Sequence, residues 1–239
     1  MRHVNMGPSG RGGRGAVRGG EPDPATPVEV TGAQRRTVYM AASLLLDYPR
    51  GGFEEYVPAV AGAAKSLPEP IAGLLSAWTS WALSVGRGVV EQKYVTTFDQ
   101  QRRCSLELTY YATGDTRQRG QALLAFRELY RAAGWELRGE ELPDYLPAVL
   151  ELCAHAEEVL TYVLPAHREG LEVLRTALYQ RESPWEGVVE ALCRVLPPID
   201  AATTARYQQL IRQGPPAELV GIKDLPPLFR GASIEKERN

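Results

Sequence analysis

The chain has 239 residues, of which 23% are charged, and its formal net charge is −2. A domain of this size buries roughly 70% of the surface that its unfolded chain exposes, so a substantial core is expected. The small net charge excludes a long-range field that would attract nucleic acid or anionic lipid, and a partner must therefore be recognised by shape.

Residues 1–33 are rich in Gly, Pro and Arg and contain almost no large apolar side chains. Such a composition cannot offset the entropy of ordering, so a disordered leader is predicted. Its G-x-G-x-x-G match at residues 10–15 has no strand before it and no helix after it, which excludes a dinucleotide site. Two "RGG" copies, at 11–13 and 18–20, are typical of RNA-binding tails and leave one alternative function open, RNA binding through the leader.

Helical signals begin after the leader. Thr31 is a candidate N-cap, an apolar run covers 38–48, and Pro-Arg-Gly-Gly at 49–52 ends the segment. A second helix is expected over 53–66 and a third from 71 toward Phe98, which Gly86 and Gly88 can split.

The stretch 100–113 fits two patterns, because Leu106, Leu108 and Tyr110 alternate as in a strand while other pairs recur at helical spacing. The flanking residues favour a helix: Asp99 can cap its start, Gly114 can end it, and Asp115 can cap the next helix. That next helix, 116–134, has one apolar face and ends at Gly134.

Three further helical segments are expected, at 143–156, at 157–182 with a break at Pro165, and at 184–196 after Ser183. No isoleucine occurs between Ile71 and Ile199, whereas leucine and alanine are abundant, which argues against a sheet. The sequence therefore predicts an all-α fold, with one helical domain over 34–205 and a poorly ordered C-terminal tail over 206–239.

The three cysteines indicate the compartment. Cys104, Cys153 and Cys193 are an odd number and follow no signal peptide, which favours reduced thiols in a cytoplasmic protein. The longest strongly apolar stretch, 38–46, is far shorter than the roughly 18–20 residues that span a bilayer. We therefore expect no membrane insertion.

Catalytic and metal motifs are weak in this sequence. Cys153 and His155 are two residues apart, so a helix points them to different faces, and His167 is isolated. A hydrolase that uses Cys104 with His155 or His167 remains a third hypothesis, although a buried structural cysteine is the favoured interpretation. No P-loop, H-E-x-x-H or G-x-S-x-G sequence occurs.

Two stretches are candidates for binding. Arg117 and Arg119 lie in the first turn of a predicted helix, where cations are disfavoured, so they are expected to serve a partner or a buried carboxylate. In 140–152, Pro143 is expected to begin a helix, with Asp144 at its positive end beside Tyr145. An acidic group next to an aromatic ring suits a basic or amphipathic peptide.

Together, "YVTTFDQQRRCSLELTYYATGDTRQRGQALLAFRELYRAAGWEL" and "ELPDYLPAVLEL" resemble the signature blocks of the NarJ family, the assembly chaperones of membrane-bound respiratory nitrate reductase. The resemblance runs from about Arg36 to Pro197. It implies the all-helical fold of the TorD and DmsD group of redox-enzyme maturation chaperones. It also implies a protein that is not an enzyme and has no cofactor of its own.

The same resemblance implies the partner. Members of this family bind the N-terminal segment of the catalytic nitrate reductase subunit and keep it competent for molybdenum cofactor insertion before membrane docking. The insertion machinery is a further candidate partner, and nucleic acid is not expected.

The resemblance also suggests site residues. Glu141 and Asp144 match the acidic residues of the wider group's Glu-Pro-x-Asp-His motif, Pro143 is displaced by one place, and Tyr145 replaces the histidine, which puts in doubt any role known for that histidine. The full set of candidate peptide-binding residues is Tyr94, Phe98, Tyr110, Tyr111, Asp115, Arg117, Arg119, Arg127, Glu141, Pro143, Asp144 and Tyr145.

Overall fold

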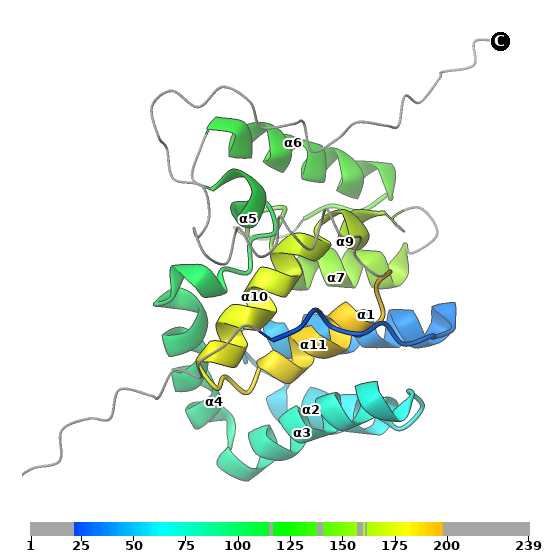
Figure 1. Ribbon diagram of the computed structural model, residues 1–239, viewed down its shortest axis with the longest axis vertical. Coiled ribbons are helices and arrows are strands. Elements are labelled where there is room, and N and C mark those ends of the chain that lie inside the picture. Colours follow the sequence, from blue (N-terminus) through cyan, green and yellow to red (C-terminus); the bar gives the residue numbers. More distant parts are fainter. Residues whose placement is uncertain (1–21, 115–116, 138–140, 157–159, 161, 198–239) are drawn as a thin grey trace, which may run out of the picture.

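The computed structural model describes residues 22–114, 117–137, 141–156, 160 and 162–197 (Figure 1). Within these residues all regular structure is helical, and the one extended pairing is an isolated antiparallel bridge between Glu107 and Tyr145. The all-α prediction is therefore confirmed for the described part of the chain. None of its helices is long and apolar enough to cross a bilayer.

The chain is built from a succession of helices and helical turns. In chain order they are α1 (Gly32–Leu46), α2 (Phe53–Ala64), α3 (Glu69–Val85), α4 (Arg87–Tyr94), a π-helical turn (Val95–Asp99), a 3₁₀ turn (Arg102–Cys104), α5 (Tyr110–Thr113), α6 (Arg117–Ala132), α7 (Leu146–His155), α9 (Val163–Ala166), α10 (Arg168–Gln180) and α11 (Glu186–Arg194).

Helix α11 is central to the packing. It contacts α1, α3 and α10, while α7 packs along α1 and α2 packs along α3. Figure 1 shows α6 at one end of the molecule and α2 and α3 at the opposite end. The main core therefore joins α1, α3, α7, α10 and α11, and α6 lies at its edge.

An aromatic cluster around Trp185 forms the centre of this core. The Trp185 side chain is fully buried, and its ring contacts Trp78, Tyr94 and Phe98 at centroid distances of 6.0, 5.8 and 5.2 Å. Its indole N–H donates to the main-chain oxygen of Leu45 at 2.8 Å, so the one polar atom of the ring is satisfied. Tyr94 and Phe98, both candidate site residues, are thus buried and pack in this core.

Several helix boundaries agree with the sequence. Thr31 is the N-cap of α1, where its hydroxyl accepts from the Gln34 N–H and the Gln34 side chain accepts from the Thr31 N–H. Gly86 divides the third predicted segment into α3 and α4, and its φ of +79° is a conformation that glycine adopts without strain. Gly134, with a φ of +78°, follows α6 as expected.

The predicted helix over 100–113 is wrong for most of its length. Only Tyr110–Thr113 is α-helical, because the main chain of residues 106–108 pairs instead with residues 144–146. The strand-like alternation of Leu106 and Leu108 was the correct signal, since both side chains are buried. Gly114 does end α5, with a φ of +56°.

The predicted helix start at Pro143 is also wrong. Helix α7 begins at Leu146, with Pro147 in its first turn. Residues 144–146 precede the helix because their main chain forms the bridge to 106–108. The Pro165 break is confirmed in position, since α9 ends at Ala166 and α10 starts at Arg168.

The predicted leader is too long. Residues 22–31 pack against α10 and α11, where the Ala25 side chain is 5% exposed and the Val28 N–H donates to the Arg194 oxygen at 2.7 Å. Disorder through residue 33 is therefore a wrong prediction for the part from 22 onward, because charged side chains far along the sequence bind this segment's main chain. The "RGG" copies and the tail over 206–239 lie outside the described residues.

Candidate functional site

The two signature stretches of the sequence meet in space. The Leu108 N–H donates to the Asp144 oxygen at 3.0 Å, and the Leu146 N–H donates to the Leu106 oxygen at 2.7 Å. These bonds flank the bridge between Glu107 and Tyr145. A pairing across more than thirty residues thus creates one local site from two sequence blocks.

Asp144 fixes the corner where α5 begins. Its side chain is fully buried, and its Oδ2 accepts from the Thr109 N–H at 3.1 Å and from the Thr109 hydroxyl at 2.5 Å. Its Oδ1 is buried and has no hydrogen-bond partner among the described residues. Asp144 therefore positions the backbone of the first block and does not form the wall of an open site.

A chain of hydroxyl groups joins this corner to α1. The Tyr145 hydroxyl donates to Asp47 Oδ1 at 2.9 Å and lies 3.0 Å from the Tyr94 hydroxyl, which in turn lies 3.1 Å from the Leu46 main-chain oxygen. Burial, together with Tyr94 and Asp47, raises the pKa of Tyr145 well above its ordinary value. Burial also raises the pKa of Tyr94, so both tyrosines stay protonated at neutral pH, and Tyr145 donates to Asp47 while Tyr94 donates to the Leu46 oxygen.

Beside this chain lies a cavity of about 310 Å³, which we call the tyrosine pocket. It lies where the end of α4, the π-helical turn, the first signature block and the start of α6 converge. Its lining residues are Tyr94, Phe98, Asp99, Arg102, Ser105, Leu106, Glu107, Tyr110, Arg119 and Tyr145.

The lining combines aromatic faces with charges of both signs. The rings of Tyr94 and Phe98 are 4.7 Å apart and form one wall, and Tyr110 is half-buried. Glu107 accepts a hydrogen bond from the Ser105 hydroxyl. The pocket can therefore hold an apolar side chain while its rim hydrogen-bonds to polar groups on either side of that chain.

The structure brings five of the predicted site residues to this pocket: Tyr94, Phe98, Tyr110, Arg119 and Tyr145. Arg119 is half-buried, whereas Arg117 and Arg127 are exposed on α6 and line no described cavity. The sequence predicted Arg117 and Arg119 as binding residues together, but only Arg119 lines the tyrosine pocket.

The other predicted residues have different surroundings. Tyr111 and Pro143 are buried, and the Tyr111 hydroxyl donates to the Ser105 oxygen at 2.8 Å. Glu141 is at the surface, in an ion pair with Arg50 at 3.2 Å. Asp115 lies outside the described residues.

Five pocket residues are absent from the predicted set: Asp99, Arg102, Ser105, Leu106 and Glu107. They lie inside the first signature block, but the helix predicted there would have turned Ser105 and Glu107, which are two residues apart, to different faces. The alternation of Leu106 and Leu108 was the signal that could have found them, because in an extended segment Ser105 and Glu107 share the face opposite those leucines.

The surroundings of the cysteines disfavour nucleophilic catalysis. Burial raises the pKa of the Cys104 thiol to about 11, and Arg181 only partly opposes this shift. The His167 ring is buried against Phe126 and its Nδ1 lies 2.8 Å from the Val163 oxygen, while His155 stacks on Trp135. Within the described ranges, no group of three or more His, Cys, Asp or Glu side chains could hold a metal ion.

Comparisons with known proteins agree with the signature blocks. The sequence model of the family described as "Nitrate reductase delta subunit" matches residues 64–190. The chain is 34% identical over 174 residues to the "Nitrate reductase-like protein NarX" of Mycobacterium tuberculosis, a match that covers 71% of this chain and 26% of NarX. This chain thus spans about a quarter of that relative.

Two shorter relatives match over more of their length. The NarJ protein of Bacillus subtilis is 28% identical over 164 residues, 68% of this chain and 89% of that protein. The "Nitrate reductase molybdenum cofactor assembly chaperone NarJ" of Escherichia coli is 32% identical over 162 residues, 64% of this chain and 66% of that protein. All three matches extend beyond the two signature blocks.

Proposed function

This chain belongs to the nitrate reductase delta subunit family, and from that membership we propose that it is a chaperone for the assembly of a respiratory nitrate reductase. It binds the N-terminal segment of the apo catalytic subunit and keeps that subunit competent for molybdenum cofactor insertion before the subunit docks at the membrane. In this proposal it is not an enzyme, and the client is held without any covalent step.

The single observation that carries the proposal is the family membership, which the names of the NarJ relatives connect with cofactor assembly. The tyrosine pocket gives that role a physical basis. Its volume of about 310 Å³ is at the lower end of the roughly 300–1,000 Å³ of small-ligand pockets, so it suits one or two anchoring side chains of a peptide. The remaining peptide would lie along the surface near α6.

Charge adds a second requirement. The pocket contains two carboxylates, Asp99 and Glu107, and two guanidinium groups, Arg102 and Arg119. A client segment with both an apolar anchor and a flanking charge of either sign can therefore be accommodated, whereas a segment without an apolar side chain would leave the aromatic wall unfilled.

The test is isothermal titration with a synthetic peptide that carries the N-terminal segment of the cognate catalytic subunit. We expect binding at tens of micromolar or tighter, and Tyr110→Ala should weaken it at least tenfold, about 1.4 kcal/mol. The matched control is Tyr162→Ala, since Tyr162 is a 50% exposed tyrosine outside both described cavities.

Two results would count against the proposal. No heat of binding at these concentrations would contradict the client assignment. Equal weakening by Tyr110→Ala and Tyr162→Ala would leave the chaperone role intact and remove the tyrosine pocket as its site.

A further inference from the structure

The segment Pro22–Thr31, which we call the strap, runs across α10 and α11 before α1 begins (Figure 1). It has no regular secondary structure and contains three prolines, which favour an extended backbone. Only one of its side chains, that of Ala25, is buried. Val28 and Val30 pack against the core but are only partly buried, so the apolar contact of the strap is limited to three small side chains.

The bonds that hold the strap use its main chain. The Ala25 N–H donates to Glu172 Oε1 at 3.1 Å, and Arg168 Nη2 donates to the Ala25 oxygen at 3.0 Å. Arg175 Nη2 donates to the Asp23 oxygen. Because no strap side chain takes part in these bonds, another extended backbone could make the same ones.

The groups that bind the strap form a built site. Arg168, Glu172 and Arg175 are exposed by only 3%, 0% and 3%, and both arginines pair with Glu172, at 2.8 and 2.7 Å. These ion pairs do not depend on the strap. When the strap leaves, Glu172 is still paired with both arginines, so no buried charge is left without a partner.

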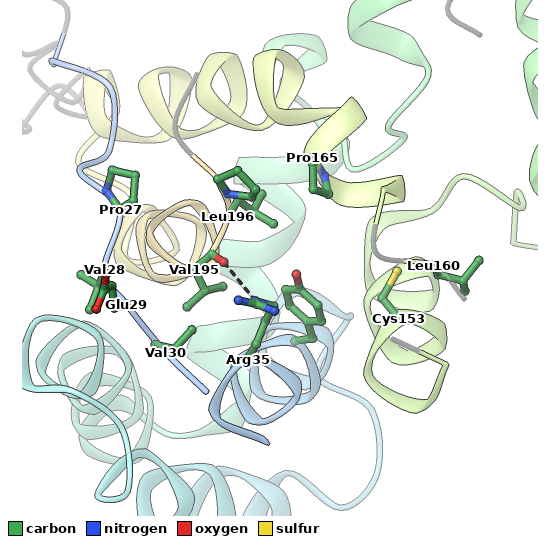
Figure 2. A pocket seen from close by; sticks show the side chains of 12 residues that line it. Pro27, Val28, Glu29, Val30, Arg35, Cys153, Leu160, Pro165, Val195 and Leu196 are labelled. Carbon is green, nitrogen blue, oxygen red and sulfur yellow. Dashed lines mark hydrogen bonds between the residues drawn. The ribbon is translucent and has the colours of Figure 1, made fainter. Parts of the chain in front are cut away.

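A cavity of about 560 Å³ adjoins the strap. Strap residues Pro27–Val30 line one side of it, and Figure 2 shows Arg35, Val195 and Leu196 beside them, with Cys153 and Leu160 on the far side. The two strap valines are only half-buried. The strap therefore fills this part of its own binding surface incompletely.

From these contacts we propose that the surface of Arg168, Glu172 and Arg175, with the adjoining cavity, is a binding site for an extended segment of a partner polypeptide. Residues 22–30 are a built-in ligand that occupies this site until the partner displaces them. The partner segment has a small side chain at the place of Ala25 and apolar side chains larger than valine at the places of Val28 and Val30. This site is separate from the tyrosine pocket and is independent of the proposed client.

The first test is fluorescence anisotropy with a labelled peptide of residues 22–31 and the full chain. In the unaltered chain the attached strap competes at an effective concentration on the order of 1 mM, so the free peptide binds weakly. Ala25→Arg in the chain places a long cation beside two arginines and ejects the strap. We expect the peptide to bind this variant at least tenfold more tightly.

The matched control is Thr26→Arg, because Thr26 is the exposed neighbour of Ala25 and its replacement leaves the strap in place. This variant should bind the peptide as the unaltered chain does. Equal affinities of the Ala25→Arg and Thr26→Arg chains for the peptide would overturn the proposal.

The cavity is tested with a second peptide that carries Val28→Leu and Val30→Leu. Each added methylene that is buried is worth about 0.8 kcal/mol, or roughly fourfold in affinity. The leucine peptide should therefore bind the Ala25→Arg chain at least threefold more tightly than the valine peptide. Equal or weaker binding would overturn the part of the proposal that concerns the cavity.

A measurement on the unaltered chain covers the case in which Ala25→Arg does not fold. The amides of Ala25 and Val28 are bonded in the strapped state and should be protected from hydrogen exchange. Unlabelled peptide at about 5 mM, above the effective concentration of the strap, should speed their exchange at least threefold. The amide of Leu171, which donates to the oxygen of His167 at the N-cap of α10, should not change, and unaltered exchange at Ala25 and Val28 would overturn the proposal.

A second copy of this chain could supply the segment instead. Analytical ultracentrifugation would then show a dimer of the unaltered chain that forms with rising concentration and is lost in Ala25→Arg. That result would overturn the assignment to a different polypeptide, and a monomer at all concentrations supports it.

Discussion

Removal of the Glu172 charge tests how the strap and the two helices beneath it are held together. Glu172 is fully buried, pairs with Arg168 at 2.8 Å and with Arg175 at 2.7 Å, and accepts the Ala25 N–H. Glu172→Gln keeps the shape of the side chain but leaves two buried guanidinium groups without this carboxylate. Breaking a buried ion pair from one side typically costs about 3–5 kcal/mol of the free energy of unfolding.

The assay is urea denaturation followed by circular dichroism, with thermal melting as a second readout. Domains of 150–250 residues lose about 2–4 °C in melting temperature per kcal/mol, so Glu172→Gln should lower it by roughly 6–20 °C. Arg175 also pairs with Glu190 at 2.6 Å, which places the expected loss toward the lower end of this range.

The matched control is Glu128→Gln on the outer face of α6. Glu128 pairs with Arg131, and the two side chains are 68% and 72% exposed. Pairs of this kind contribute about 0–1 kcal/mol, so the control should leave the urea midpoint nearly unchanged. A loss below 1 kcal/mol in Glu172→Gln would refute the reasoning, because it would mean that the two arginines do not depend on this charge.

Three further predictions concern single side chains. Tyr145→Phe removes the donor to Asp47 and should lower the free energy of unfolding in urea by about 1 kcal/mol. Tyr48→Phe should have no effect, since the Tyr48 hydroxyl makes no hydrogen bond within the described part of the chain, and equal midpoints for the two variants would contradict this. Burial lowers the pKa of His167 below its ordinary 6.5, against smaller opposing effects of Val163 and Asp144, so its contribution to stability is present above pH 6.5 and is lost as the pH falls below that value. His167→Gln should flatten the fall in melting temperature below pH 6.5, and an unchanged slope in this variant would exclude this source. With a pKa near 11, Cys104 should resist iodoacetamide at pH 8 in the native chain and react after denaturation, which mass spectrometry of the peptide that contains Cys104 measures; rapid native labelling would show that the thiol is accessible.

Local chemistry made much of the fold predictable. Caps and helix-ending glycines act within a few residues, so Thr31, Gly86 and Gly134 could be assigned from the sequence alone, and the structure confirms them. The apolar face of the helix at 116–134 was also correct, since Phe126 and Tyr130 are its buried residues. These features need no information from the rest of the chain.

Long-range contacts explain what the sequence did not predict. The segment 105–107 is extended and leads into a turn at 108–109, because Asp144 and Leu146 pair with it, whereas local spacing alone favoured a helix there. The strap was assigned to a disordered leader because its composition is poor in apolar side chains, whereas Arg168 and Glu172, more than 140 residues away, bind its backbone. Because these bonds use the main chain of the strap, its side chains give no sequence pattern from which they could be predicted.

The same logic separates folding from binding within the candidate site. Asp144, the clearest acidic residue of the second signature stretch, is fully buried and bonded to Thr109, so its replacement would disturb the corner that aligns both stretches. A loss of client binding in an Asp144 variant would therefore not identify a contact residue. Tyr110 and Arg119 lie on the pocket wall and are only half-buried, so changes there alter the surface while the bridge between Glu107 and Tyr145 remains. Peptide affinity measured at these two positions, with stability measured in parallel, is what distinguishes a recognition residue from one that only holds the site in shape.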